Sequence, residues 1–177
     1  VWIASSPTYD KATSSFSGAN LHALDPQNNW VHLSPKEGLV SWNALSMTLL
    51  RNSNLLLTTN AGFSILTPSG EISNFSARDG LKPFYLFSVA LDPLGRPWFA
   101  HQYFGDGVTW FDGNEFHRLA SEAKLFKDRI SWIAHDRVGR VWLVASDGSV
   151  GVYPMSYFDA NKTSVAVRKQ KQVDLLN

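Results

Sequence analysis

One stretch of the chain occurs twice, and this recurrence constrains the fold more than any other feature of the sequence. Residues 91–100 read LDPLGRPWFA, and residues 134–145 read AHDRVGRVWLVA. The copies share an aspartate, a glycine, an arginine and a tryptophan, and the two tryptophans lie 44 residues apart, at 98 and 142. A period in the forties, built from short β-rich segments, is typical of the blades of a β-propeller and not of a helical solenoid.

The shared residues have the chemistry of a tight turn between two strands. The carboxylates of Asp92 and Asp136 can accept hydrogen bonds from backbone N–H groups two residues further along the chain. Gly95 and Gly139 supply the backbone position with positive φ that such a turn requires. An apolar alternating run precedes each copy, and a β-branched or aromatic run follows it. We therefore assign these four residues to structural turns between the innermost strand of a blade and its second strand.

The fold predicted for the whole chain is all-β, a β-propeller region of about four blades with four antiparallel strands each. The blades are expected at 1–33, 42–75, 85–119 and 130–170, with a closing strand at 172–177. In the second blade the signature has decayed, because Leu50, Ser53 and Leu56 stand in place of the aspartate, the glycine and the tryptophan. The spacing of its strands is nevertheless kept.

The first and last blades are read from shorter matches. VWIAS at 1–5 matches VWLVA at 141–145, so the chain is expected to begin at the second strand of a blade. We therefore expect that residue 1 is not the natural start of the protein. Residues 6–17 are rich in serine and threonine and are predicted to form a loop. TSVAVRK at 163–169 is predicted as the outer strand of the fourth blade.

Four blades in an open arc would leave strand edges without a hydrogen-bonding partner. They would also expose an apolar wall, the face that packs against the next blade in a complete ring. We expect the chain to be part of a larger ring of about six to eight blades, whose remaining blades cover the wall. Two alternatives stay open at this point. The chain can close as a four-bladed ring with 172–177 as an inner strand, or a second copy of the chain can complete an eight-bladed ring.

Composition narrows the range of partners. The formal charge of +1 gives no electrostatic reason to expect nucleic acid or an anionic membrane as partner. The absence of cysteine removes disulfides, thiolate nucleophiles and cysteine-based zinc sites together. No apolar run approaches the roughly 18 residues of a membrane span, so no transmembrane segment is expected. The five histidines lack metal-binding spacing, so we expect no metal, and we expect no cofactor.

A binding site is expected on one face of the propeller. Linkers between blades and loops after second strands open on this face, at 6–17, 34–42, 60–61, 76–85, 101–107, 120–129 and 146–148. His101, Gln102 and Tyr103 bring polar and aromatic groups together at the end of a strand, as recognition of a sugar requires. The matching linker residues are Trp42, Tyr85 and Arg129, and all six are candidate ligand-binding residues. No catalytic residue is assigned.

The order of these motifs resembles a known repeat family. Residues 78–153 carry Gly-Leu, an inner strand, Asp-x-x-Gly-Arg-x-Trp, Gly-Val and Phe-Asp-Gly-x-x-Phe. This order resembles the two-component regulator propeller repeat. The resemblance implies an extracytoplasmic sensor of a bacterial hybrid histidine kinase or related signalling protein, periplasmic or extracellular, which commonly recognises carbohydrate fragments. It carries over no binding residue, because the matching positions belong to turns and to the core.

The function expected from these features is a non-catalytic module that binds a small polar ligand and passes the signal to a partner. An enzyme is the alternative, because GRPWFA also resembles the strands of the streptogramin lyase family. A third hypothesis is an assembly scaffold whose exposed edges are interfaces. Saturable binding without turnover would distinguish the module from both alternatives.

Overall fold

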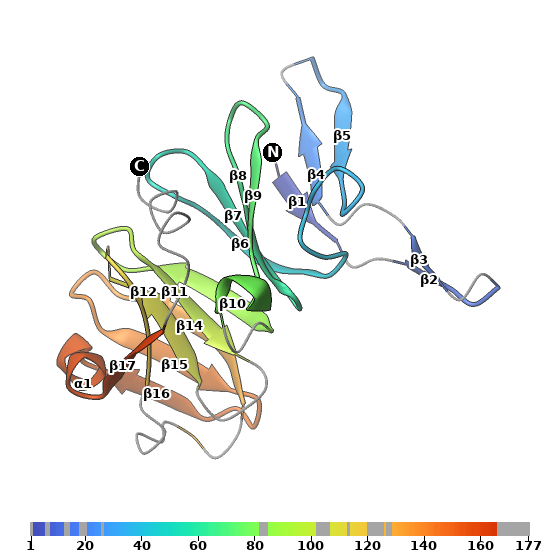
Figure 1. Ribbon diagram of the computed structural model, residues 1–177. Coiled ribbons are helices and arrows are strands. Elements are labelled where there is room, and N and C mark those ends of the chain that lie inside the picture. Colours follow the sequence, from blue (N-terminus) through green and yellow to red (C-terminus); the bar gives the residue numbers. More distant parts are fainter. Residues whose placement is uncertain are drawn as a thin grey trace.

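The computed structural model describes residues 2–5, 8–12, 15–17, 21–25, 27–81, 85–101, 107–112, 114–119, 126 and 129–165 of the chain. The described part is predominantly β-structure, with four larger antiparallel sheets and one separate hairpin (Figure 1). The prediction of an all-β fold is confirmed. Within the described residues, no helix has the length and apolar character needed to cross a membrane.

Each larger sheet is built mainly from strands that follow one another in the chain. Sheet one has the order β1 (Trp2–Ala4), β4 (Leu21–Leu24), β5 (Trp30–Leu33). Sheet two has the order β6 (Ala44–Leu49), β7 (Leu55–Thr59), β8 (Gly62–Leu66), β9 (Ile72–Phe75). Sheet three contains β10 (Leu86–Leu91), β11 (Pro97–His101), β12 (Val108–Phe111) and β13 (Phe116–Leu119), and sheet four contains β14 (Ile130–His135), β15 (Val141–Ala145) and β16 (Val150–Tyr153).

Successive sheets pack face to face in chain order. The inner strand β6 contacts β1 on one side and β10 on the other, and β10 also contacts β14. Side chains alternate between the two faces of a strand, so a central strand contributes to two cores. In β7, for example, Leu55 and Leu57 belong to the apolar cluster with sheet one, whereas Leu56 belongs to the cluster with sheet three. This double burial explains why LLLTT is apolar at consecutive positions.

The last strand of the described chain departs from the expectation. The predicted outer strand of blade four is wrong, because β17 (Lys162–Val165) pairs antiparallel with β13 and becomes the fifth strand of sheet three. The short helix α1 (Met155–Ala160) redirects the chain after β16. Its Phe158 is fully buried and lies edge-on to Trp98 and Trp110, with ring centroids 5.1 and 5.7 Å away. The contacts of Phe158 hold α1 against sheet three, and the chain that follows the helix pairs with β13 of that sheet.

The loop predicted at 6–17 is also corrected. It contains a two-stranded hairpin, β2 (Thr8–Asp10) and β3 (Ser15–Ser17), in which Tyr9 lies opposite Phe16. Threonine and aromatic residues favour strands, which accounts for pairing inside a segment that is otherwise polar. The hairpin projects away from the larger sheets (Figure 1). The predicted closing strand at 172–177 lies outside the described residues.

The two copies of the repeated stretch form the same turn. Asp92 Oδ1 accepts hydrogen bonds from the N–H groups of Leu94 and Arg96, both at 2.9 Å, and its other oxygen accepts one from Arg96 Nε at 2.6 Å. Asp136 makes the matching contacts to Val138 and Arg140. Gly95 and Gly139 have φ of +84° and +82°. These are three-residue hairpin loops, with a type I turn followed by a left-handed residue.

The decayed copy keeps this geometry without the glycine. Ser53 has φ of +65°, and its N–H donates to Leu50 O at 3.0 Å, as Gly95 N–H donates to Asp92 O at 2.8 Å. The flanking strands β6 and β7 therefore hold a serine in the left-handed region that glycine occupies in the other copies.

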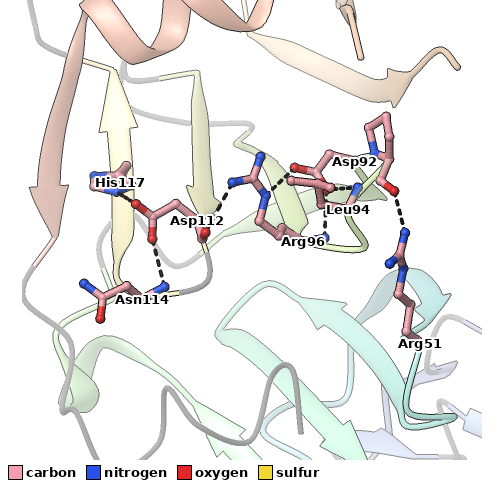
Figure 2. A network of polar contacts seen from close by, with 8 residues as sticks. Arg51, Asp92, Leu94, Arg96, Asp112, Asn114 and His117 are labelled. Atoms are coloured by element: carbon pink, nitrogen blue, oxygen red, sulfur yellow. Dashed lines mark hydrogen bonds and ion pairs between the residues drawn. The ribbon is translucent and has the colours of Figure 1, made fainter. Parts of the chain in front are cut away.

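A polar network joins the turns of neighbouring sheets (Figure 2). Arg51, in the turn of sheet two, donates to Pro93 O in the turn of sheet three, and Arg96 donates to Asp112 O at 3.2 Å. The Asp112 carboxylate in turn contacts His117 Nε2 at 2.6 Å. Burial acts to raise the pKa of Asp112, but hydrogen bonds from the Glu115 N–H, from His117 and from the Asn114 N–H outweigh it and lower the pKa to about 2. Asp112 is therefore a carboxylate at neutral pH.

Candidate functional site

The face expected to hold the site lies at the opposite ends of the strands from these turns. Here the last pairs of the inner hairpins are Ala44 with Thr59, Leu86 with His101, and Ile130 with Ala145. Each inner strand has a register shift immediately after this pair. Bulges of this kind are common at sheet edges and next to binding sites, where they redirect side chains.

A pocket opens on this face beside sheet two. Its volume is about 620 Å³, and it lies between the linker before β6, the turn between β7 and β8, and the segment after β9. It is lined by Leu39, Val40, Ala61, Asn74, Ser76, Arg78 and Asp79. All of these except Asn74 fall in the segments 34–42, 60–61 and 76–85, which the sequence analysis assigned to the binding face.

Hydrogen bonds across the strands hold one wall of the pocket. Ser64 Oγ donates to Asn74 Oδ1 at 2.7 Å and accepts from the Val40 N–H at 3.0 Å. Asn74 Nδ2 donates to Gly38 O at 2.7 Å. These contacts connect the linker of 34–41 to β8 and β9. The wall is therefore preorganised by the sheet and does not depend on loop order.

The other wall is a short 3₁₀ helix with a capping box. In η1 (Ala77–Asp79), Ser76 Oγ accepts from the Arg78 N–H at 3.3 Å, and the Asp79 carboxylate accepts from the Ser76 N–H at 3.0 Å. Asp79 is buried, whereas the Arg78 side chain is exposed at the pocket. The reciprocal bonds fix the backbone from which the guanidinium projects.

The preceding linker repeats this structure. Ser34 donates from its N–H and its Oγ to the Glu37 carboxylate, at 2.8 and 2.6 Å. Both linkers then continue with Gly-Leu, and the leucines Leu39 and Leu81 are buried. The Gly-Leu pair of the repeat at 78–153 was recognised in the sequence, but the serine three residues before the acid was not. That spacing is the signal of a capping box, and it would have identified the walls of this pocket.

Of the candidate residues at 101–103, the structure describes only His101. His101 is buried, with 2% of its surface exposed, and its Nε2 lies 2.7 Å from Thr109 Oγ1. Burial lowers the pKa of His101 to about 3, so its imidazole is neutral at pH 7. This environment is that of a residue inside the sheet, and its side chain is not presented to solvent. Gln102 and Tyr103 lie outside the described residues.

The three linker candidates stand one or two residues before the start of three inner strands. Trp42 and Tyr85 are half-buried, and Arg129 is exposed. They precede β6, β10 and β14 respectively, so they belong to three different sheets. None of the three lines the pocket beside sheet two. The structure therefore gathers a different set of residues around the pocket, and none of them was among the six candidates.

Comparisons with known proteins bear on the fold. No model of a known family matches the chain, and no significant match is found among curated proteins. Among solved structures, the chain is similar to the extracellular domain of a hybrid two-component system from B. thetaiotaomicron, with a TM-score of 0.61 and 17% identity over 78% of this chain. It is also similar to virginiamycin B lyase from Staphylococcus aureus, with a TM-score of 0.51 and 10% identity over 75% of this chain.

These neighbours are β-propeller proteins. The fold is a β-propeller. The predicted resemblance to propeller-type sensor domains is thus confirmed in fold. A streptogramin B lyase structure matches as well, with a TM-score of 0.50 and 14% identity over 76% of this chain. The chain spans 21% of the length of the B. thetaiotaomicron domain and 47% of each lyase.

Proposed function

We propose that this propeller region is a non-catalytic ligand-binding module of a bacterial signalling protein, and that it recognises a small polar ligand such as a carbohydrate. The observation that carries the proposal is the preorganised pocket beside sheet two, on the face formed by linkers and second-strand loops. The similarity in fold to an extracellular domain of a two-component system supports it.

The same proposal includes the cellular location of the module and its protein partners. A periplasmic or extracellular location is supported by the similarity to an extracellular domain. The remaining blades of a larger ring, or a second copy of the chain, are the proposed protein partners. The match to about a fifth of the B. thetaiotaomicron domain supports the larger ring, because that structure is several times longer than this chain.

The chemistry of the pocket favours a polar ligand of modest size. Leu39, Val40 and Ala61 supply apolar contact surface, and Asn74 and Arg78 supply polar groups. This mixture suits a sugar, which has C–H faces as well as hydroxyl groups. The guanidinium of Arg78 is permanently charged and can form two parallel hydrogen bonds. The carboxylate of Asp79, the other charged residue of the lining, is buried and accepts hydrogen bonds from Ser76, so an acidic sugar is favoured over a neutral one.

A binding screen tests this proposal directly. Neutral and acidic mono- and oligosaccharides are added to the chain, and binding is followed by thermal shift and then by isothermal titration calorimetry. We expect saturable binding of an acidic sugar, which Arg78→Ala weakens by about 10- to 100-fold through loss of a charge-assisted hydrogen bond. Lys36→Ala is the matched control, since Lys36 is an exposed cation on the neighbouring linker that does not line the pocket. Equal affinity in both variants would exclude this pocket as the site.

A propeller lyase is the second candidate, because two of the similar structures are lyases. Virginiamycin B is the substrate that the name of one neighbour provides. Incubation of the chain with virginiamycin B, followed by mass spectrometry, distinguishes the two functions. The sensor proposal expects the antibiotic to be recovered unchanged, and catalytic turnover would replace it with the lyase hypothesis.

A further inference from the structure

Two histidines face each other on the open face of sheet one. His22 on β4 and His32 on β5 are cross-strand partners, and a hydrogen bond of 2.7 Å joins their Nδ1 atoms. The rings meet edge to face, with centroids 4.8 Å apart and planes at 85°. His22 is half-buried, and His32 is exposed. The pair is therefore accessible from solvent and takes no part in the pocket beside sheet two.

The juxtaposition follows from a rigid turn. Asp25 Oδ1 accepts from the N–H groups of Gln27 and Asn29, at 2.9 and 2.7 Å, and Asn28 has φ of +64°. This is the same three-residue loop as in the repeated stretch, with asparagine in place of glycine. A loop of this length places residue 24 opposite residue 30, and hence His22 opposite His32. The sequence spacing of ten residues hides this contact until the turn type is recognised.

A third residue orients the pair from behind. Ser5 follows β1, and its Oγ lies 2.8 Å from His22 Nε2. When His22 Nε2–H donates to this hydroxyl, the proton is held on Nε2 and the lone pair of Nδ1 is left to face His32. A histidine that ligates a metal through one ring nitrogen commonly uses the other nitrogen in this way. Ser5 is thus placed as an outer partner of a ligand.

We propose that His22 and His32 form a two-imidazole site for a divalent transition metal of tetragonal preference, Cu²⁺ or Ni²⁺. With metal–nitrogen bonds of about 2.0 Å, two ligands at 90° lie about 2.8 Å apart, whereas two tetrahedral ligands lie about 3.3 Å apart. At present the two Nδ1 atoms share a hydrogen bond of 2.7 Å, so an ion would displace its proton and the atoms would move slightly apart. Imidazole nitrogens suit Cu²⁺ and Ni²⁺, and copper has the highest affinity for such sites in the divalent series. A small rotation of the two rings away from each other would admit the ion between the Nδ1 atoms.

The strand residues around the pair carry no charge that would repel a cation. Besides the histidines, the strand residues on this face are apolar: Ile3, Leu24 and Trp30. No third histidine, cysteine or carboxylate of the described residues joins the pair in a cluster. The protein therefore supplies two ligands, and the remaining positions are taken by water or by donor atoms from outside the described chain.

Titration of the tag-free chain with CuCl₂ or NiCl₂ tests the site. Calorimetry should show one ion per chain, and the electron paramagnetic resonance spectrum of the copper-loaded chain should show two equivalent nitrogen ligands. We expect copper to bind more tightly than nickel or zinc. His32→Ala and His22→Ala should each remove the two-nitrogen signature, and Ser5→Ala should weaken binding by about 10- to 100-fold.

Trp30→Phe is the matched control, because it alters the same face of the same strand and leaves both imidazoles in place. It should bind copper as the unaltered chain does. Circular dichroism verifies that each variant keeps its sheets, and His32→Gln provides a polar replacement if His32→Ala fails to fold. The proposal is overturned if the unaltered chain shows no saturable binding. It is equally overturned if the double variant His22→Ala, His32→Ala retains the two-nitrogen spectrum.

Discussion

Gly95 and Gly139 share a backbone conformation but have different neighbours. Both have positive φ, at +84° and +82°. A Cβ atom added at Gly95 would lie 2.5 Å from Nε of Arg51, the residue that donates to Pro93 O across the boundary between sheets two and three. At Gly139 the nearest atom would be Pro93 Cγ at 3.8 Å. The first glycine thus serves the turn and an inter-sheet contact, and the second serves the turn alone.

Substitution by alanine separates these two roles. Gly139→Ala should lower the free energy of unfolding by about 1–3 kcal/mol, because alanine is strained at this φ. Gly95→Ala should cost about 1 kcal/mol more, since it also displaces Arg51 from its hydrogen bond. Urea unfolding of both variants measures the difference.

A double-mutant cycle with Arg51→Ala is the control for this assignment. In the Arg51→Ala background the two alanine substitutions should cost the same. If the extra cost at Gly95 persists there, the inter-sheet contact is not its cause.

At the scale of elements, α1 and β17 decide how the described chain ends. Phe158 is the buried residue of α1, and it packs against Trp98 of β11 and Trp110 of β12. β17 follows two residues later and covers the free edge of β13. An uncovered edge strand invites association with other chains, so the helix also protects sheet three.

Phe158→Ala should therefore act on β17 as well as on the core. We expect the loss of a buried aromatic side chain to cost about 3–5 kcal/mol, as in other cores. Hydrogen exchange of the amides of Lys162–Val165 should accelerate more than that of β7, because β17 depends on the helix for its position. Tyr157→Ala, at a half-buried neighbour on the same helix, is the control. Equal acceleration in β7 and β17 would mean global destabilisation without a specific anchor.

At the scale of the whole molecule, the outward faces of the first and last sheets are incompletely covered. On sheet four the open face carries Trp132, Val150 and Val152, whose exposed fractions are 51, 60 and 40%. The residue equivalent to Trp132 in sheet three is Ser88, which is 5% exposed because sheet four covers it. The open face of sheet one carries Ile3 and Trp30, at 45 and 51%. The face of sheet four has the character of an interface between blades, whereas the face of sheet one also carries the histidine pair of the proposed metal site.

Light scattering over a range of concentrations measures whether these faces associate. We expect a mass above the 19.7 kDa of a single chain. Replacing Trp132 and Val152 by glutamate should lower the mass to that of the monomer, because charge opposes burial of the face. Leu94→Glu is the control, since Leu94 is 63% exposed but lies in a turn away from this face. A monomer at every concentration would contradict the prediction and favour closure within one chain.

The repeated turns were predictable because their chemistry is local. A carboxylate acceptor, a left-handed residue and the closing hydrogen bond all lie within five residues, as in 92–96 and 136–140. The pocket was not predictable to the same degree. Its face was expected, but Val40, Asn74 and Arg78 come from separate elements, and only hydrogen bonds such as that from Asn74 to Gly38 bring them together.

The sequence by itself determined that the chain folds into an all-β propeller. Its 44-residue period, its turn residues and the doubly buried strands such as 55–59 each depend on near neighbours. Only the tertiary structure decided that β17 pairs with β13 and that His101 is buried. Long-range pairing depends on which edges and faces the rest of the chain leaves uncovered. These uncovered edges and faces exist only after the sheets have packed, so no short sequence pattern encodes them.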